Sequence, residues 1–152
     1  MEQIVIMDNN LNGDRVFLFL QGPHGPFFFQ LAKMLEIAGC RCWRVGFNAA
    51  DKVFWRPSSK FISFKEPYCE WPATFRKIVT DKSITDLVLY GDTREIHQKA
   101  ILEARKLNIE VHVFEEGYLR PYWVTYERGG SNRNSRLTLD TSDQLISGFF
   151  RC

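Results

Sequence analysis

Short apolar runs alternate with segments of helical periodicity along the first three quarters of the chain. Residues 15–20 form a nearly continuous apolar run that leads directly into the glycines and prolines of residues 22–26. This arrangement is typical of a buried parallel strand that enters a loop. From Pro26 onward, apolar residues recur at helical spacing until Gly39, which is placed to end the helix. The start of the chain therefore predicts a strand, a loop and a helix.

The same alternation continues as far as residue 114. Residues 42–47, 87–90 and 110–114 are short apolar runs that predict three further strands. One helix is expected to begin near Trp71, and another after Thr93, whose hydroxyl can cap it. The apolar face of that last helix consists of Ile96, Ala100, Ala104 and Leu107.

Alternating strands and helices predict an α/β fold, a Rossmann-like parallel sheet with flanking helices. All strands of such a sheet end at the same edge, which we call the rim. The stretch between Pro57 and Pro67 is less regular and predicts neither a helix nor a strand. Four polar or glycine-containing segments are expected to gather along the rim: residues 21–26, 48–51, 91–94 and 115–120.

The length of 152 residues suits one domain with its own hydrophobic core. Residues 1–14 are predicted to be an N-terminal extension, and residues 15–127 the Rossmann-like domain. Residues 128–152 turn polar and are expected to be a linker or a truncated tail, with no further strand-helix unit.

Composition narrows the possible environments and partners. A formal charge of +2, with basic residues scattered along the chain, does not favour nucleic acid as a partner. The acidic start does not resemble a signal peptide, and the early apolar run is too short to span a membrane. The cysteines have neither a zinc-binding spacing nor the density of a disulfide framework, so we expect a reducing cytoplasm and no metal: Cys40, Cys42, Cys69 and Cys152.

Three rim segments carry candidate chemistry, each with a structural alternative. Residues 21–26 bring glycines to a helix N-terminus, which suits an anion or a sugar, but the same residues suit a tight turn. Asp92, Arg94 and His97 could hold a hydroxylated substrate, or Asp92 could be a cap partner and His97 an ordinary histidine. Glu115 and Glu116 end a buried strand, and adjacent residues there point to opposite sides. One carboxylate is therefore expected to face the substrate, unless the pair is only a solvated turn.

The rim segments, taken together and in order, resemble the KpsS/LipB capsular polysaccharide family. The resemblance covers about residues 15–135, and the combination of blocks is far more specific than any one of them. The blocks that carry it are residues 20–28, 47–51, 90–97, 114–121 and 129–132.

The resemblance implies a retaining glycosyltransferase that moves 3-deoxy-octulosonic acid (Kdo) from CMP-Kdo to a lysophosphatidylglycerol acceptor. Such enzymes have two Rossmann-like domains that face a cleft, an arrangement called GT-B, and this chain would supply the N-terminal half. The His-Pro and Ser/Thr-rich motifs by which the other domain holds the nucleotide are not found in the sequence. We therefore expect that the reading frame is truncated or frameshifted and that the chain is inactive on its own. Its implied partners are the CMP-sugar donor, the lipid acceptor, other capsule synthesis or export proteins and, peripherally, the inner face of the inner membrane.

The resemblance also implies roles for single residues. Related Kdo transferases carry an acidic residue before the glycine of the corresponding block, which makes Glu116 the expected nucleophile. Asp92 and His97 are candidates for acceptor positioning or proton transfer, and the guanidinium of Arg94 or Arg120 could pair with the sugar's carboxylate. The expected substrate-binding residues are Gly22, Pro23, His24, Gly25, Asn48, Asp51, Arg94, Glu115, Arg120 and Asn132.

Two other functions stay open. The chain could be a non-catalytic module that binds capsule lipid or export proteins, which would retain lipid affinity without binding CMP. It could also be a small nucleotide-binding Rossmann protein unrelated to sugars, but residues 21–26 lack the Gly-x-Gly-x-x-Gly pattern and the Lys-Ser/Thr of a phosphate loop.

Overall fold

The computed structural model describes residues 14–55, 60–116, 123–128 and 149–151. Strands and helices alternate along the first part of this range, and two more strands follow at its end. The elements are β1 (Val16–Phe19), α1 (Phe27–Ile37), β2 (Arg41–Gly46), α2 (Ala49–Val53), β3 (Phe61–Ser63), the 3-10 helix η2 (Tyr68–Glu70), α3 (Trp71–Lys82), β4 (Asp86–Tyr90), α4 (Glu95–Lys106), β5 (Glu110–Glu116), β6 (Trp123–Arg128) and β7 (Phe149–Arg151).

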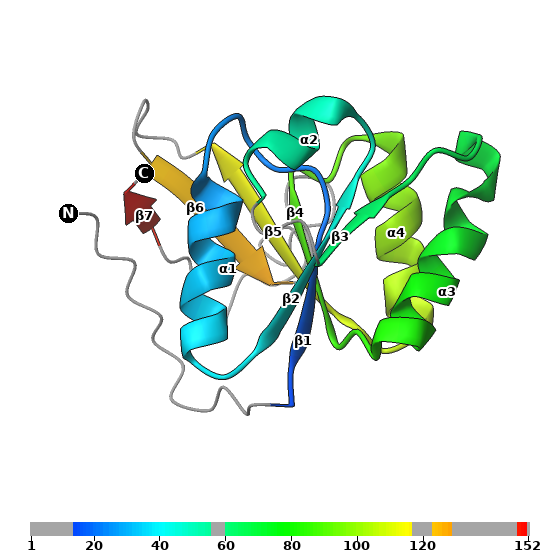
Figure 1. The fold of residues 1–152 in the computed structure, drawn as a ribbon, viewed down its shortest axis with the longest axis horizontal. Coiled ribbons are helices and arrows are strands. Elements are labelled where there is room, and N and C mark those ends of the chain that lie inside the picture. The colour runs from blue at the N-terminus through cyan, green and yellow to red at the C-terminus, as the bar shows by residue number, and fades with distance from the viewer. Residues whose placement is uncertain (1–13, 56–59, 117–122, 129–148, 152) are drawn as a thin grey trace, which may run out of the picture.

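The described strands form one sheet in the order β3-β2-β1-β4-β5-β6-β7 (Figure 1). The first five strands in this order are parallel, whereas β6 and β7 pair antiparallel. The predicted α/β, Rossmann-like fold is therefore confirmed. Beside this parallel part of the sheet, β6 and β7 add two antiparallel strands that the sequence did not predict.

Helices cover both faces of the sheet, with α1 on one face and α3 and α4 on the other (Figure 1). Strand β1 shows why the strands read as continuous apolar runs. Val16 and Leu18 pack in the core with α3 and α4, while Phe17 and Phe19 pack in the core with α1. Because both faces are buried, neither set of alternating positions can be polar.

Three local predictions need correction. Residues 48–51 are not an open loop, because Asn48 caps the short helix α2. The irregular stretch between Pro57 and Pro67 contains β3, an edge strand of only three residues. Thr93 does not cap α4, because the N-cap position is Arg94 and no side chain makes a cap hydrogen bond there.

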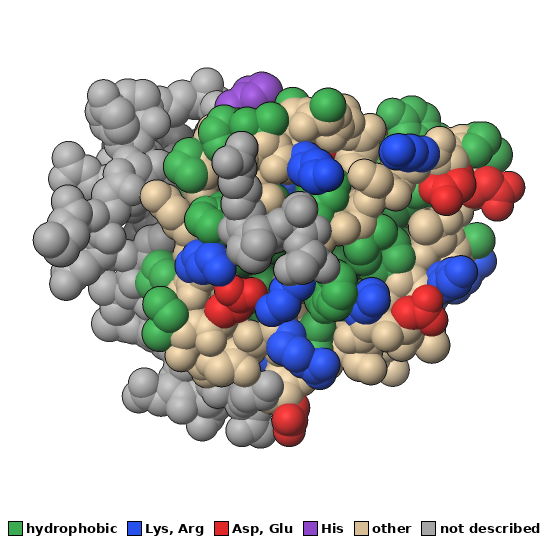
Figure 2. Space-filling view, viewed as in Figure 1, with side chains coloured by type: hydrophobic (Ala, Val, Ile, Leu, Met, Phe, Trp, Pro, Cys, Tyr) green, Lys and Arg blue, Asp and Glu red, His purple; other side chains and the backbone are tan. Residues whose placement is uncertain are grey.

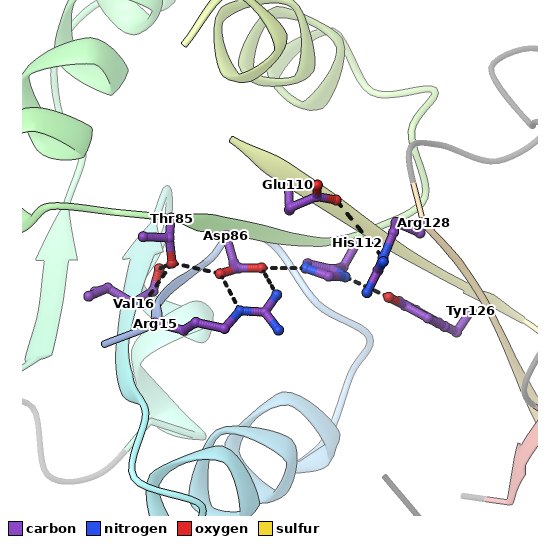
Figure 3. Close-up of polar contacts among 8 residues, drawn as sticks. All are labelled: Arg15, Val16, Thr85, Asp86, Glu110, His112, Tyr126 and Arg128. Atoms are coloured by element: carbon purple, nitrogen blue, oxygen red, sulfur yellow. Dashed lines mark hydrogen bonds and ion pairs between the residues drawn. The ribbon is translucent and has the colours of Figure 1, made fainter. Parts of the chain in front are cut away.

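A network of buried polar side chains crosses the sheet on the face of α1 (Figure 3). Asp86, at the start of β4, is 1% exposed. Arg15 forms an ion pair with this carboxylate and also donates from Nε to Oδ2 over 3.1 Å. On the other side, His112 Nε2 lies 2.7 Å from Asp86 Oδ1, and His112 Nδ1 lies 2.6 Å from the hydroxyl of Tyr126. The network therefore joins the residue before β1 to β4, β5 and β6.

The proton positions in the network follow from the chemistry of the groups. A carboxylate only accepts hydrogen bonds, so His112 Nε2 carries a hydrogen and donates it to Asp86. The second ring nitrogen, Nδ1, makes the contact with the hydroxyl of Tyr126. Burial by itself would raise the pKa of Asp86, but hydrogen bonds from His112, Arg15 and Thr85 outweigh it and lower the pKa from 3.8 to about 2.

Replacing Asp86 with asparagine is expected to lower the free energy of unfolding at pH 7 by about 3 kcal/mol, because Arg15 loses its buried counterion and His112 loses its charged acceptor. Urea denaturation measures this loss. In the unmodified protein, the stabilisation by Asp86 is present above its ordinary pKa of 3.8 and is lost as pH falls toward 2, and the variant lacks this dependence.

The matched control for this experiment is Asp81→Asn on α3, whose carboxylate is exposed. This change is expected to alter the free energy of unfolding by no more than about 0.5 kcal/mol. A loss of that small size in Asp86→Asn as well would contradict a stabilising role for the network.

Candidate functional site

The carboxyl ends of the parallel strands meet at one rim, as the sequence predicted. Leu20 N–H donates to the carbonyl of Val88 over 2.9 Å, and Tyr90 N–H donates to the carbonyl of Gln21 over 3.3 Å. Gly91 N–H donates to the carbonyl of Phe114 over 2.7 Å. The backbone that follows β1 and the backbone that follows β4 are therefore held to each other and to β5 at this edge.

The strand order reverses between β1 and β4. From β1, the chain proceeds through α1 to β2 on one side, whereas β4 continues through α4 to β5 on the other. Two connections that diverge to opposite faces leave a crevice at the strand ends, and open α/β sheets bind ligands there. A side-chain hydrogen bond crosses it, from Arg94 Nη1 to Gln21 Oε1 over 2.7 Å.

The loop of residues 21–26 owes its glycines to the local structure. A Cβ on Gly22 would lie 2.6 Å from Cδ2 of Phe28, so only glycine allows that ring to pack at the start of α1. Gly25 has a φ of 112°, which side-chain-bearing residues rarely adopt. Pro23 is half-buried and His24 is exposed. The structural alternative for the glycines is supported, and it leaves the expected substrate contacts of this loop as predictions.

Asn48 and Asp51 make a reciprocal cap at the start of α2. Asp51 N–H donates to Asn48 Oδ1 over 3.1 Å, while Asp51 Oδ2 accepts from the backbone N–H of Phe47 over 2.8 Å and of Asn48 over 3.3 Å. Arg44 approaches the other oxygen of Asp51 to 3.5 Å. These contacts fix the loop after β2, so any substrate contact by Asp51 would share a carboxylate already used by the fold.

The expected trio after β4 divides into two buried residues and one exposed residue. Arg94 is exposed at the rim, whereas Asp92 and His97 are 2% and 0% exposed. His97 Nδ1 lies 2.6 Å from the carbonyl of Gly91, whose φ is 71°. Because a carbonyl only accepts, Nδ1 carries the hydrogen and His97 supports this turn. His97 thus positions the loop, and its expected part in proton transfer stays a prediction.

Burial also controls the ionisation of His97. It lowers the pKa of His97 from 6.5 to about 4, against the opposing effect of the hydrogen bond to Gly91. The side chain is therefore neutral at pH 7. Its Nε2 atom is buried and has no hydrogen-bond partner within the described part of the chain.

The acidic pair lies at the end of β5. Glu115 pairs with Thr125 and Glu116 with Val124 in the antiparallel register with β6. Glu115 is half-buried. Two other expected site residues, Arg120 and Asn132, lie outside the described residues, so their roles stay predictions.

The rim also contains a pocket whose lining was only partly expected from the sequence. It has a volume of about 180 Å³ and lies where Gln21 meets the beginning of α4. Of its lining residues, only Arg94 was among the site residues expected from the sequence. The others are Gln21, Tyr68, Glu95, Ile96 and Lys99. Tyr68 precedes α3, in a stretch with no recognisable motif, so only the folded chain brings it to the rim.

The described residues contain neither a metal-binding cluster nor a membrane-spanning helix. Within residues 14–55, 60–116, 123–128 and 149–151, no three His, Cys, Asp or Glu side chains gather in a group that could hold a metal ion. Across the same ranges, no helix has the length and apolar character needed to cross a membrane. Lys and Arg side chains on the face in Figure 2 are interspersed with acidic and apolar ones.

Comparison with known proteins confirms the predicted resemblance. A family model described as capsule polysaccharide biosynthesis protein matches residues 85–151. The capsule polysaccharide export protein KpsS of Escherichia coli is 36% identical over 124 residues, which are 82% of this chain and 32% of KpsS. The capsule polysaccharide modification proteins LipB of Neisseria meningitidis serogroups A and B are each 36% identical over 141 residues, which are 90% of this chain and 34% of LipB.

These matches support an assignment to capsule polysaccharide biosynthesis and modification. The chain spans about a third of the length of the curated relatives it matches. The family match begins just before β4 and includes Asp86, His97, His112 and the acidic pair.

The free energy of unfolding is expected to fall by about 3 kcal/mol between pH 7 and pH 4 because of His97. The sign follows from the lowered pKa: the unfolded chain takes up the proton near pH 6.5, whereas the folded chain resists it down to about pH 4. Stability is therefore complete above pH 6.5 and is lost below it. Urea denaturation at several pH values measures the slope.

His97→Gln is expected to flatten this slope between pH 6.5 and pH 4, because no proton is taken up at that position. His24→Gln, at an exposed histidine, is the matched control and is expected to keep the slope. Equal slopes in both variants would show that His97 does not resist protonation.

Proposed function

We propose that this chain supplies one side of the active site of a retaining glycosyltransferase that moves Kdo from CMP-Kdo to lysophosphatidylglycerol. The observation that carries the proposal is the meeting of the residues after β1 and β4, beside β5, at the point where the strand order reverses. The relatives named for capsule polysaccharide export and modification support the choice of chemistry. A second domain, as in a GT-B arrangement, would close the cleft from the other side.

The proposed reaction is a double displacement at the anomeric carbon of the sugar. The Glu116 carboxylate attacks this carbon and forms a glycosyl ester, while the bond to CMP breaks and its electrons leave with the phosphate. The acceptor hydroxyl then attacks the same carbon from the opposite side and releases Glu116. Two inversions return the original configuration.

The remaining rim residues would bind the substrates and accept the proton. Arg94 or Arg120 would pair with the sugar's carboxylate, since a guanidinium offers parallel donors to a planar anion. The acceptor hydroxyl must lose a proton, and Asp92 and His97, which follow β4, are the candidates to accept it. A lipid acceptor implies peripheral contact with the inner face of the inner membrane and a cytoplasmic location.

The second candidate is a non-catalytic module that binds capsule lipid or export proteins. It is favoured by the name of the Escherichia coli relative KpsS, a capsule polysaccharide export protein. Binding of lysophosphatidylglycerol without binding of CMP would distinguish this module from a transferase half.

The 152-residue chain alone is expected to transfer no Kdo from CMP-Kdo, because most of the relatives' length is absent from it. A chimera in which residues 15–128 replace the matching segment of Escherichia coli KpsS is expected to transfer Kdo. Mass spectrometry of the lipid product measures both. Turnover by the chain alone at the rate of the chimera would contradict the two-domain proposal, and an inactive, folded chimera that binds lipid but not CMP would favour the module.

In this chimera, Glu116→Gln is expected to lower the rate of transfer on the order of a thousandfold or more, because glutamine keeps the shape but lacks the attacking charge. Folding is expected to survive. The matched variant is Glu115→Gln on the neighbouring residue, which should act on binding or stability instead. Loss of transfer in Glu115→Gln with retention in Glu116→Gln would reverse the assignment, and two harmless changes would move the nucleophile to another residue, with Asp92 first.

A further inference from the structure

The pocket beside Gln21 and Arg94 lies at the reversal of strand order but has no assigned ligand. Its volume is about 180 Å³. Pockets for whole drug-sized ligands are larger, about 300 Å³ or more. The pocket therefore suits one end of a substrate, such as one charged group and the carbons next to it.

Two cationic side chains of the pocket favour an anion. Gln21 Oε1 accepts one hydrogen bond from Arg94 and so holds the guanidinium at the pocket. A guanidinium has five N–H donors, so others remain for a ligand. Lys99 Nζ lies 2.7 Å from Glu95, whose side chain is 77% exposed. Exposed pairs of this kind contribute little energy, so an incoming anion can compete with Glu95 for Lys99.

The wall of the pocket is amphipathic. Tyr68, on η2, is 63% exposed and offers both an aromatic face and a hydroxyl. Ile96 adds an apolar surface at the first turn of α4. Such a wall suits a ligand that carries carbon and hydroxyl groups beside its charge, rather than a bare ion.

The wall is also fixed in place by buried contacts. Trp71 Nε1 donates to the carbonyl of Ile96 over 3.0 Å, which ties the start of α3 to the start of α4. Trp71 is fully buried and makes edge-on ring contacts with Phe47, Phe64 and Phe75 at centroid distances of 5.0 to 5.7 Å. The backbone at the start of α3 and at the start of α4 is therefore held together on this side of the pocket.

We propose that this pocket is a subsite for the anionic group of a substrate, a carboxylate or a phosphate on a hydroxylated carbon chain or ring, with Lys99 and Tyr68 as contacts beside Arg94. The proposal rests on the proposed function for the source of the anion. The carboxylate would come from the sugar, and the phosphate from the glycerol phosphate of the lipid acceptor.

The test is an NMR titration of the 152-residue chain with Kdo and with glycerol 3-phosphate, at constant ionic strength. Galactose and glycerol are the neutral controls. The anions are expected to shift the indole N–H signal of Trp71 and the amide signals of residues 94–99, and the neutral compounds are not. A response to Kdo alone identifies the sugar's carboxylate, a response to glycerol 3-phosphate alone identifies the acceptor, and a response to both indicates a general anion subsite.

Variants then locate the binding. Arg94→Gln with Lys99→Gln is expected to raise Kd about tenfold or more, since charged hydrogen bonds are lost. Lys99→Gln alone, which leaves the hydrogen bond from Arg94 to Gln21 intact, is also expected to raise Kd. The matched control is Arg41→Gln with Lys77→Gln, two exposed cations on β2 and α3 that are not part of the pocket, and it is expected to leave Kd unchanged.

Three results would overturn the subsite: no shift with either anion, equal shifts with galactose, or an equal loss of affinity in the control variant. Other results distinguish a failure of the proposed function from a failure of the subsite. A chimera that transfers no Kdo while the chain still binds Kdo through Arg94 and Lys99 contradicts the reaction and leaves the subsite. Normal transfer by a chimera whose Arg94 and Lys99 are both glutamine contradicts the subsite and leaves the reaction.

Discussion

The buried carboxylate of Asp86 is the charge around which the sheet is organised. Removing a carboxylate from water costs several kcal/mol unless partners replace the lost hydration. In this fold, the partners come from three other parts of the chain: Arg15 before β1, His112 on β5 and, through His112, Tyr126 on β6. The cost is therefore met only when these strands stand in their observed order. A shift of β5 by one residue would move His112 to the face of α3 and α4 and leave Asp86 without this donor.

The two ends of the sheet differ in the groups that they carry. The charged network occupies the amino-terminal ends of β4 and β5, where Asp86 pairs in register with Glu110. The opposite rim is left to turns, with Gly91 at a positive φ and His97 beneath it. The fixed end sets the strand positions, and the loops at the other end inherit their spacing from it. Open α/β sheets bind their ligands at this carboxyl end, at the point where the strand order reverses.

The sequence predicted what depends on neighbours along the chain and missed what depends on distant contacts. Strand β1 and helix α1 were found because apolar spacing and the residues that end each element are local. Strand β3 was missed because three edge residues carry no periodicity, and β6 because polar residues follow it. The role of Asp86 could not be seen, since its partners Arg15 and His112 are 71 and 26 residues away. The rim was predicted from strand direction alone, whereas the burial of His97 and the approach of Tyr68 needed the packed helices.

The contacts that rim residues already make limit which of them can be the reactive group. Asp51 is committed to the cap of α2, and His97 to the carbonyl of Gly91. Asp92 is almost fully buried, and Arg94 and Lys99 are cations, which cannot attack a carbon as a carboxylate does. A carboxylate that attacks a sugar must reach the substrate and must not be needed for folding. The proposed nucleophile, Glu116, is the last residue of β5. In the proposed reaction, the binding groups would come from the start of α4 and the reactive group from the end of β5, the strand that neighbours β4.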